Sequence, residues 1–117
     1  MTVYQTINSI LSELKIPCET LEFKKAPQPD TFVVLTPISD DFDLYAGDSP
    51  TVEVNSVRIN LYTKRNFIKT VRDITNALFL NDFSVTDRRL ANFDKDTRYS
   101  HYAIECEKIW DINIENN

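Results

Sequence analysis

The sequence predicts an α+β domain: an antiparallel or mixed β-sheet of about four strands, with two α-helices packed on one face and a long acidic hairpin loop. Within residues 51–80 the apolar period changes from two, the period of a strand, to 3.6, the period of a helix. Residues 2–15 carry a second stripe of apolar side chains at helical spacing. Strand-like runs precede and follow these segments, and this order favours an antiparallel sheet with both helices on one side.

The size and charge of the chain limit the classes of protein it can be. With 117 residues it is expected to form a single domain, 1–117, and 42% apolar residues are enough for a buried core. The presence of only one glycine argues against a glycine-rich phosphate loop. The net charge of −5 disfavours DNA binding by charge alone, because such binding needs many basic side chains. No stretch is apolar enough for a membrane span, and the N-terminus does not resemble a signal peptide. We therefore expect a soluble cytoplasmic protein. No cofactor is expected.

The first expected elements are a helix and an extended connector. Five apolar side chains within residues 2–15 fall on one helical face, and Pro17 ends the run because proline disfavours helical backbone in the residue before it. Residues 17–30 mix charges with three prolines. We therefore expect an extended connector there, with a short strand at Glu19–Phe23.

The next segment is a strand followed by the acidic loop. Thr31–Ser39 is rich in β-branched and aromatic residues, and Pro37 implies an edge position or a break in pairing near its end. Residues 40–50, DDFDLYAGDSP, contain the only glycine and are expected to form a loop.

The alternation of the following strand changes phase part-way along. The valines at 52 and 54 point to the opposite face from the apolar residues at 57, 59 and 61. A bulge or a bend near Asn55 would correct this slip. We therefore expect Asp40–Val54 to form a projecting hairpin and the sheet proper to begin near Ser56.

A helix, two strands and a turn complete the expected order. The helix follows the basic link at residues 63–65 and ends at residues 81–82. Strands are expected at Phe83–Leu90 and Arg98–Trp110, joined by a turn at Asn92–Lys95 that Asn and Asp favour. The buried face of the helix is expected to include Ile68, Val71, Thr75 and Leu78.

A cluster of carboxylates is the densest group of potential metal ligands. Asp40, Asp41 and Asp43 lie close together, and Asp48 follows shortly after. Such side chains can bind a hard cation such as Mg²⁺ or Ca²⁺, but they lack the ligand ladder, central glycine and closing glutamate of an EF-hand. A solvated acidic loop is the main alternative.

No catalytic motif is evident. His101 is the only histidine, and nothing near it in sequence forms a recognisable triad or metal-binding motif. Cys18 and Cys106 are far apart in sequence and are expected to be free thiols. Paired carboxylates for glycoside hydrolysis stay an open alternative, although nothing in the sequence places two of them across a cleft. We expect a protein that is not an enzyme.

Basic side chains cluster around the start of the second helix and in the penultimate strand. The two groups are Lys64, Arg65, Lys69 and Arg72, and Arg88 with Arg89. The first group can be a solvated helix face, a protein contact or a small nucleic-acid surface, and the acidic balance of the chain disfavours the last. Because positive charge at a helix N-terminus opposes the helix dipole, we expect Lys64 and Arg65 to have acidic partners, on another subunit in one hypothesis.

The order of elements resembles a known family. An N-terminal amphipathic helix, the strand TFVVLTPIS, an acidic aromatic loop and the strand VNSVRINLYTK followed at once by a helix are similar to the tail terminator and tail-completion (tail-to-head joining) proteins of long-tailed bacteriophages and prophages. The best-matching stretch is VRINLYTKRNFIKTVRDITNAL, Val57–Leu78, and YSHYAIECEKIW, Tyr99–Trp110, resembles the last strand of the family. The likeness covers most of residues 3–112 and depends on pattern rather than on an invariant motif. The low glycine content and the long connector depart from the family pattern.

The resemblance implies a structural virion protein of the phage tail or neck, and not an enzyme. It implies a homo-oligomeric ring, a hexamer in the assembled tail, that ends polymerisation of the tail tube and docks to the head connector, while isolated subunits can stay monomeric. The implied partners are further copies of the chain, the tail tube protein and the head-completion or connector protein. DNA passes through without specific binding, and no membrane takes part. A head-closure or connector adaptor of the neck is the nearest alternative, and a small non-phage binding domain is another.

Under this hypothesis the charged clusters are assembly surfaces. Four carboxylates would face the ring lumen or the docking partner, namely those of Asp40, Asp41, Asp43 and Asp48. A neighbouring subunit would offer acidic groups to three basic side chains, those of Lys64, Arg65 and Lys69. The implied location is the virion, assembled in the cytoplasm of the bacterial host.

Overall fold

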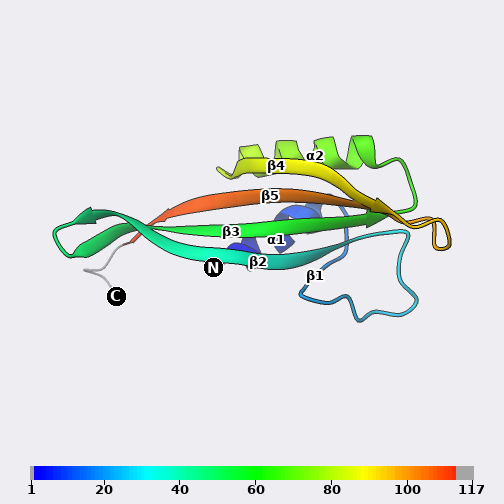
Figure 1. Cartoon of the computed structure of the whole chain (residues 1–117), viewed down its shortest axis with the longest axis horizontal. Coiled ribbons are helices and arrows are strands. Elements are labelled where there is room, and N and C mark those ends of the chain that lie inside the picture. Colours follow the sequence, from blue (N-terminus) through cyan, green and yellow to red (C-terminus); the bar gives the residue numbers. More distant parts are fainter. Residues whose placement is uncertain (1, 113–117) are drawn as a thin grey trace.

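The structure, a computed structural model that describes residues 2–112, is built around one five-stranded β-sheet (Figure 1). Its elements in chain order are α1 (Val3–Glu13), β1 (Cys18–Thr20), β2 (Thr31–Ala46), β3 (Ser49–Thr63), α2 (Phe67–Leu80), β4 (Ser84–Phe93) and β5 (Ser100–Asp111). The strands lie side by side in the order β1-β2-β3-β5-β4. A sheet combined with two helices confirms the predicted α+β class.

The short strand β1 makes the sheet mixed. It runs parallel to β2, with Cys18 opposite Val33, whereas the other neighbouring strands are antiparallel. The strand predicted at Glu19–Phe23 is displaced toward the N-terminus. Leu21 has a positive φ of 72°, which turns the chain out of the strand.

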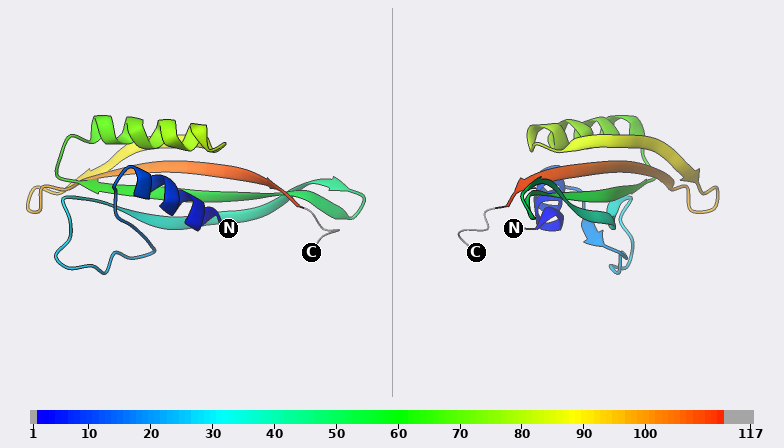
Figure 2. Two further views of the ribbon diagram at one scale, coloured as in Figure 1. Left: turned by 180° about the vertical axis from the view of Figure 1, so that it is seen from behind. Right: turned by 60° about the vertical axis from the view of Figure 1, so that its left-hand side comes forward.

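Both helices pack against the same face of the sheet. They lie behind the sheet in Figure 1 and in front of it in the left-hand view of Figure 2, and we call the opposite face the open face. The apolar stripes of the helices meet alternate residues of β2, β3 and β5 in a single core. Its fully buried side chains include Ile7 and Leu11 of α1, Ile74 and Leu78 of α2, and Leu35, Ile59, Leu61 and Ile104 of the strands.

A capping box begins α1. The Thr2 hydroxyl accepts a hydrogen bond from the Gln5 amide at 3.1 Å, and the Gln5 side chain accepts one from the Thr2 amide at 2.9 Å. These two bonds satisfy amides that a helix start otherwise leaves without partners. The helix therefore begins at Val3, and it ends at Glu13, within the predicted residues 2–15.

α2 buries a stripe that differs from the predicted one at its first turn. Its buried residues are Val71, Ile74, Thr75 and Leu78. The prediction for Ile68 is wrong, because this side chain is 57% exposed. The stripe continues back to Phe67 instead, which stacks on Tyr102 with ring centres 5.4 Å apart. Asn66 caps the helix by accepting a hydrogen bond from the Ile68 amide at 2.9 Å.

Residues 40–50 belong to a β-hairpin, so the prediction of a hairpin at Asp40–Val54 is confirmed, and the prediction that residues 40–50 are a loop is wrong. β2 continues to Ala46, a two-residue turn at Gly47 and Asp48 follows, and β3 begins at Ser49. Gly47 has a φ of +66°, so the only glycine lies where the tight turn requires it. The prediction failed because acidic side chains on an exposed strand keep their hydration while the backbone still forms its ladder of hydrogen bonds.

The bulge predicted near Asn55 is absent from β3, and the register shift of this hairpin lies in the partner strand β2 instead. The β2–β3 ladder shifts between Pro37 and Ser39, at the proline that predicted a break in pairing. β3 itself pairs with β5 without interruption over residues 52–63, so β3 contains no bulge at Asn55. The valines at 52 and 54 therefore do point to the opposite face from Val57.

The end of the β2–β3 hairpin projects from the body of the domain (Figure 1). β5 accompanies β3 as far as Val52, which lies opposite Asp111. Residues 44–51, around the turn, continue as a two-stranded ribbon. The sheet thus extends beyond the boundary predicted near Ser56, and the projecting part is shorter than the predicted Asp40–Val54.

The β4–β5 hairpin closes the other edge of the sheet. β4 extends to Phe93, so the turn lies at residues 94–99 and not at the predicted 92–95. Asn92 is still paired with β5. The Asp94 carboxylate builds the turn by accepting hydrogen bonds from the amides two and three residues on, at 2.9 and 3.3 Å.

Candidate functional site

The acidic hairpin, defined as residues 40–54, carries the carboxylates singled out in the sequence. Asp40 points to the helix side of the sheet, Asp41 and Asp43 both point to the open face, and Asp48 lies in the turn. All four residues are exposed. Within residues 2–112 no three His, Cys, Asp or Glu side chains are grouped so that they could hold a metal ion.

Asp40 lies at the base of the acidic hairpin, near the start of α1. The Asn55 side-chain amide donates a hydrogen bond to Asp40 Oδ1 at 2.6 Å. Burial, and then the charge of Asp40, raise the pKa of Tyr4 above its ordinary value. A hollow of about 430 Å³ lies here and is also lined by Trp110, whose Nε1 is buried without a hydrogen-bond partner among the described residues.

Large apolar side chains share the acidic hairpin with the carboxylates. Phe42, Leu44 and Tyr45 are 57%, 65% and 61% exposed, and we call these three residues the apolar tip. Apolar side chains exposed together are typical of a surface that another molecule covers. The charges of this segment were predicted from the sequence as a possible functional cluster, whereas its apolar tip was not.

The link from β3 to α2, which carries Lys64 and Arg65, and the first turn of α2, which carries Lys69, lie near the other end of the molecule, which is 55 Å long (Figure 1). Arg88 and Arg89 lie in β4. Arg65 Nη2 is 3.7 Å from Asp30 Oδ2, and Lys69 Nζ is 2.8 Å from a carboxylate one turn along α2. Lys64 Nζ lies 4.9 Å from the centre of the Tyr99 ring in a cation–π contact. Arg65 therefore has an acidic partner within the chain. These ion pairs are exposed and weak, so they leave the basic groups able to change partner.

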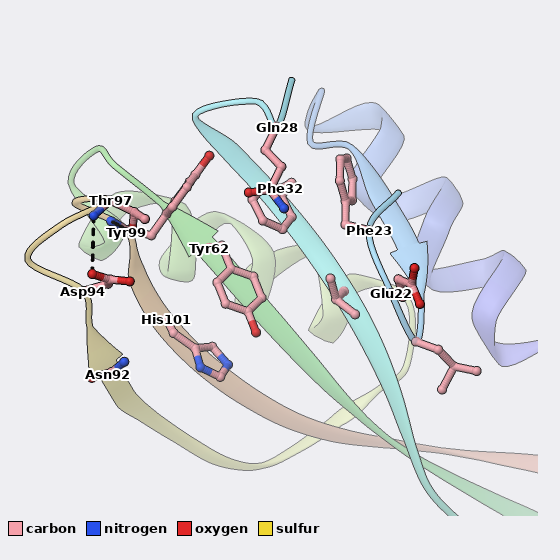
Figure 3. Close-up of a pocket in the computed structure, with 12 residues that line it drawn as sticks. Glu22, Phe23, Gln28, Phe32, Tyr62, Asn92, Asp94, Thr97, Tyr99 and His101 are labelled. Carbon is pink, nitrogen blue, oxygen red and sulfur yellow. Dashed lines mark hydrogen bonds between the residues drawn. The ribbon is translucent and has the colours of Figure 1, made fainter. Parts of the chain in front are cut away.

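A row of aromatic rings crosses the open face at this end of the sheet (Figure 3). Phe32, Tyr62 and His101 occupy facing positions on β2, β3 and β5, so the register of the sheet brings them together. The ring centres are 5.0 Å apart for Phe32 and Tyr62 and 4.5 Å apart for Tyr62 and His101, both pairs stacked. Phe23, from the connector, packs on Phe32 with ring centres 4.5 Å apart.

These rings line a hollow of about 570 Å³, which we call the aromatic hollow. Tyr99 also lines it, and its hydroxyl donates a hydrogen bond to the Pro29 carbonyl at 2.6 Å. This bond ties the connector to the β4–β5 turn and so holds two walls of the hollow together. Its polar lining includes Gln28, Asn92, Asp94 and Thr97 (Figure 3).

The aromatic hollow could not be recognised from the sequence. Its strand residues alternate with core residues, and in a single strand such positions resemble ordinary surface positions. The sequence contains one hint of this surface. Tyr62 and His101 are ring side chains at strand positions that face away from the core, where a solvated sheet face usually carries polar residues. Only the pairing of distant strands places them in one row.

A buried amide holds the histidine of this row. The Asn60 side-chain nitrogen donates to the Val34 carbonyl at 3.0 Å and to Thr36 Oγ1 at 2.9 Å. Its oxygen then accepts a hydrogen bond from His101 Nε2 at 3.0 Å. Asn60 is only 7% exposed, so these partners satisfy an amide that would otherwise be costly to bury.

His101 is expected to make the stability of the fold depend on pH. Burial, and then the positive charge of Arg58, lower the pKa of His101 below its ordinary value of 6.5. Above about pH 7.5 the ring is neutral in the folded and unfolded states alike. As the pH falls, the unfolded chain takes up the proton first, so the free energy of unfolding decreases until the folded protein is protonated as well.

His101→Gln keeps a hydrogen-bond donor toward Asn60 and removes the titration. Urea unfolding between about pH 7.5 and 5.5 is therefore expected to show a smaller loss of stability in the variant than in the wild-type protein. An equal loss in both proteins would contradict this origin of the pH dependence.

Neither thiol is activated as a nucleophile. Burial, and then the charge of Glu19, raise the pKa of Cys18 to about 12. Burial, and then the charge of Glu107, raise the pKa of Cys106 to about 12 as well. Little thiolate forms at neutral pH in either case. The two free cysteines lie on β1 and β5, with β2 and β3 between them.

Comparisons with known proteins add no family to this description. No protein-family model matches the chain, and no match was found among the curated proteins. Neither α1 nor α2, the helices of residues 2–112, is long and apolar enough to cross a membrane. The acidic hairpin and the aromatic hollow, near opposite ends of the sheet, are therefore the surfaces from which a function can be argued.

Proposed function

We propose that this protein is a structural virion component, a tail terminator or tail-to-head joining protein of a long-tailed bacteriophage. In this function, copies of the chain form a ring, expected to be a hexamer, at the top of the tail tube. The ring ends polymerisation of the tube protein and presents the surface to which the head-completion or connector protein docks. Its action is geometric, and no residue is assigned a catalytic role.

The division of charge between the two ends of the molecule carries this proposal. Five acidic and no basic residues lie between residues 40 and 54. Lys64 and Arg65 lie in the link from β3 to α2, near the end of the sheet farthest from the hairpin turn (Figure 1). Opposite charges at the two ends favour contacts between the front of one copy and the back of the next. Such repeated contacts close into a ring when the rotation between subunits allows it.

The acidic hairpin also suits a ring through which DNA passes. Negative charge at the lumen repels the phosphate backbone and prevents the DNA from adhering. The net charge of −5 acts in the same direction. We assign to the lumen or to the docking face the carboxylates of Asp40, Asp41, Asp43 and Asp48.

Deletion of the gene from the phage that encodes it tests this function. Because a terminator stops tube growth, the deleted phage is expected to produce tails longer than normal that are not joined to heads, as seen by negative-stain electron microscopy of lysates. Wild-type protein supplied from a plasmid is expected to restore the normal length. Tails of normal length that stay unjoined would identify a head-closure or connector adaptor instead. A normal yield of infectious particles without the gene would contradict both assignments.

A further inference from the structure

The apolar tip and the aromatic hollow lie toward opposite ends of the β2–β3 hairpin (Figures 1 and 3). The apolar tip lies next to the turn, with Leu44 and Tyr45 in the ribbon beyond the last pair of β3 with β5. The hollow is lined by residues near the start of β2 and the end of β3. The same two strands carry the apolar tip at one end and line the hollow at the other. A chain therefore cannot place its apolar tip in its own hollow.

We propose that the apolar tip of one copy docks in the aromatic hollow of the next copy. This inference rests on the proposed function for its ring, whereas the contact itself requires only that the chain assembles with itself. In this contact Tyr45 packs against the part-exposed rings of Tyr62 and His101, and the exposed apolar surface of both copies leaves water.

The two surfaces match in size and character. The volume of the hollow, about 570 Å³, is in the range of sites that hold small organic ligands, so it can receive an aromatic side chain. Phe32 is only 4% exposed, so the stacked and part-exposed rings of Tyr62 and His101 offer the surface for further aromatic contacts. Its polar lining, which includes Gln28 and Asn92, can hydrogen-bond a tyrosine hydroxyl.

Charge favours the same pairing. The segments around the hollow, residues 21–30, 63–65 and 94–99, contain six basic and four acidic residues, whereas the acidic hairpin contains five acidic residues and no basic one. The exposed ion pair of Arg65 with Asp30, at 3.7 Å, is weak enough to exchange for a carboxylate of the neighbour. The rims of the contact therefore attract each other and guide its orientation.

This contact has one consequence for symmetry. Each copy offers one apolar tip and one aromatic hollow, so copies related by one repeated rotation produce a closed ring or an open chain. Under two-fold symmetry the contact is reciprocal, because each copy then places its tip in the hollow of the other. The partner that the geometry favours is thus a second copy of the chain.

Photo-crosslinking tests the contact directly. Tyr45 is replaced by the photoreactive p-benzoylphenylalanine in ¹⁵N-labelled protein, which is mixed with unlabelled wild-type protein at high concentration and irradiated. Mass spectrometry is expected to find mixed-isotope links to peptides that contain residues 21–34 or 92–101. The same photoreactive residue at Leu80, which is 85% exposed on α2, is the control and is expected to give at least about tenfold fewer of these links.

Two variants that fill the aromatic hollow sharpen the test. Asn92→Trp fills the hollow from β4, and Gln28→Trp fills it from the connector. Because both residues are exposed, neither substitution changes the core. Each variant, used as the unlabelled partner and shown to be folded by circular dichroism, is expected to lower the yield of links at least about tenfold. Links that persist with both variants, links only to other surfaces, or no mixed-isotope link at all would overturn the contact.

The outcome is distinguishable from a failure of the proposed function. Tail length in the gene deletion reports the function without reference to the aromatic hollow. Overlong tails together with an absence of tip-to-hollow links would mean that the ring uses another interface. Tip-to-hollow links together with normal tails would mean that the chain assembles in this way for another purpose.

Discussion

Ile74→Ala is expected to lower the free energy of unfolding by about 2–5 kcal/mol. Ile74 is fully buried in the core between α2 and the sheet, so its truncation removes buried apolar surface and leaves a cavity. Ile68→Ala on the same helix is expected to change the free energy of unfolding by less than about 0.5 kcal/mol. The reason is that Ile68 is 57% exposed. The two substitutions share residue type and helix and differ chiefly in burial.

Urea unfolding followed by circular dichroism measures both values, and a constant denaturant slope shows that the unfolded state is comparable in the two variants. Equal losses at the two positions, or a greater loss at Ile68, would mean that Ile68 belongs to the buried stripe, as predicted from the sequence. In the structure Phe67 and not Ile68 continues this stripe toward Tyr102.

Neutralising the acidic hairpin is expected to reduce the yield of infectious phage at least about tenfold while leaving the fold intact. The variant combines Asp40→Asn, Asp41→Asn and Asp43→Asn. Each substitution removes a charge but keeps a side-chain oxygen, so Asn55 retains a hydrogen-bond acceptor at position 40. Under the proposed function, the yield is expected to fall because the hairpin loses charge that would repel DNA phosphates and attract the basic end of a neighbouring copy.

Plaque counts measure this effect when the variant is supplied from a plasmid to the gene-deleted phage. A control variant with the same change of net charge carries Glu13→Gln, Asp82→Asn and Asp87→Asn, at exposed positions outside the hairpin. The control is expected to support a normal yield. An unchanged yield with the hairpin variant would count against the role assigned to its carboxylates. Unfolding of both variants within about 0.5 kcal/mol of the wild-type protein excludes a loss of stability as the cause.

Most of the fold could be predicted from local patterns. The stripe at residues 2–15 and the change of period within residues 51–80 located both helices and β3, because these patterns arise from which side chains the backbone aligns on one face. The acidic segment at residues 40–50 misled the prediction, since polar composition was taken as evidence for a loop. In the structure, backbone pairing with β3 outweighs composition, and the one glycine only reverses the chain at its turn.

The candidate surfaces were predictable only in part. The carboxylates of the acidic hairpin and the basic link after β3 are visible as charge clusters in the sequence. The aromatic hollow was missed because Phe32, Tyr62 and His101 come from three strands that are far apart in the chain. The pairing of Arg65 with Asp30 was also beyond prediction, since it depends on how the connector returns to the start of β2.

The sequence by itself determined the class of the fold, the faces that its helices and strands bury and the charge of its projecting hairpin. These properties depend on residues a few positions apart, where the helical and strand periods are fixed by backbone geometry. The tertiary structure alone decided the length of the hairpin, the place of its bulge and the row of rings beside the connector. Those features depend on the register between β2, β3 and β5, which is set by contacts between distant residues and determines which exposed side chains become neighbours.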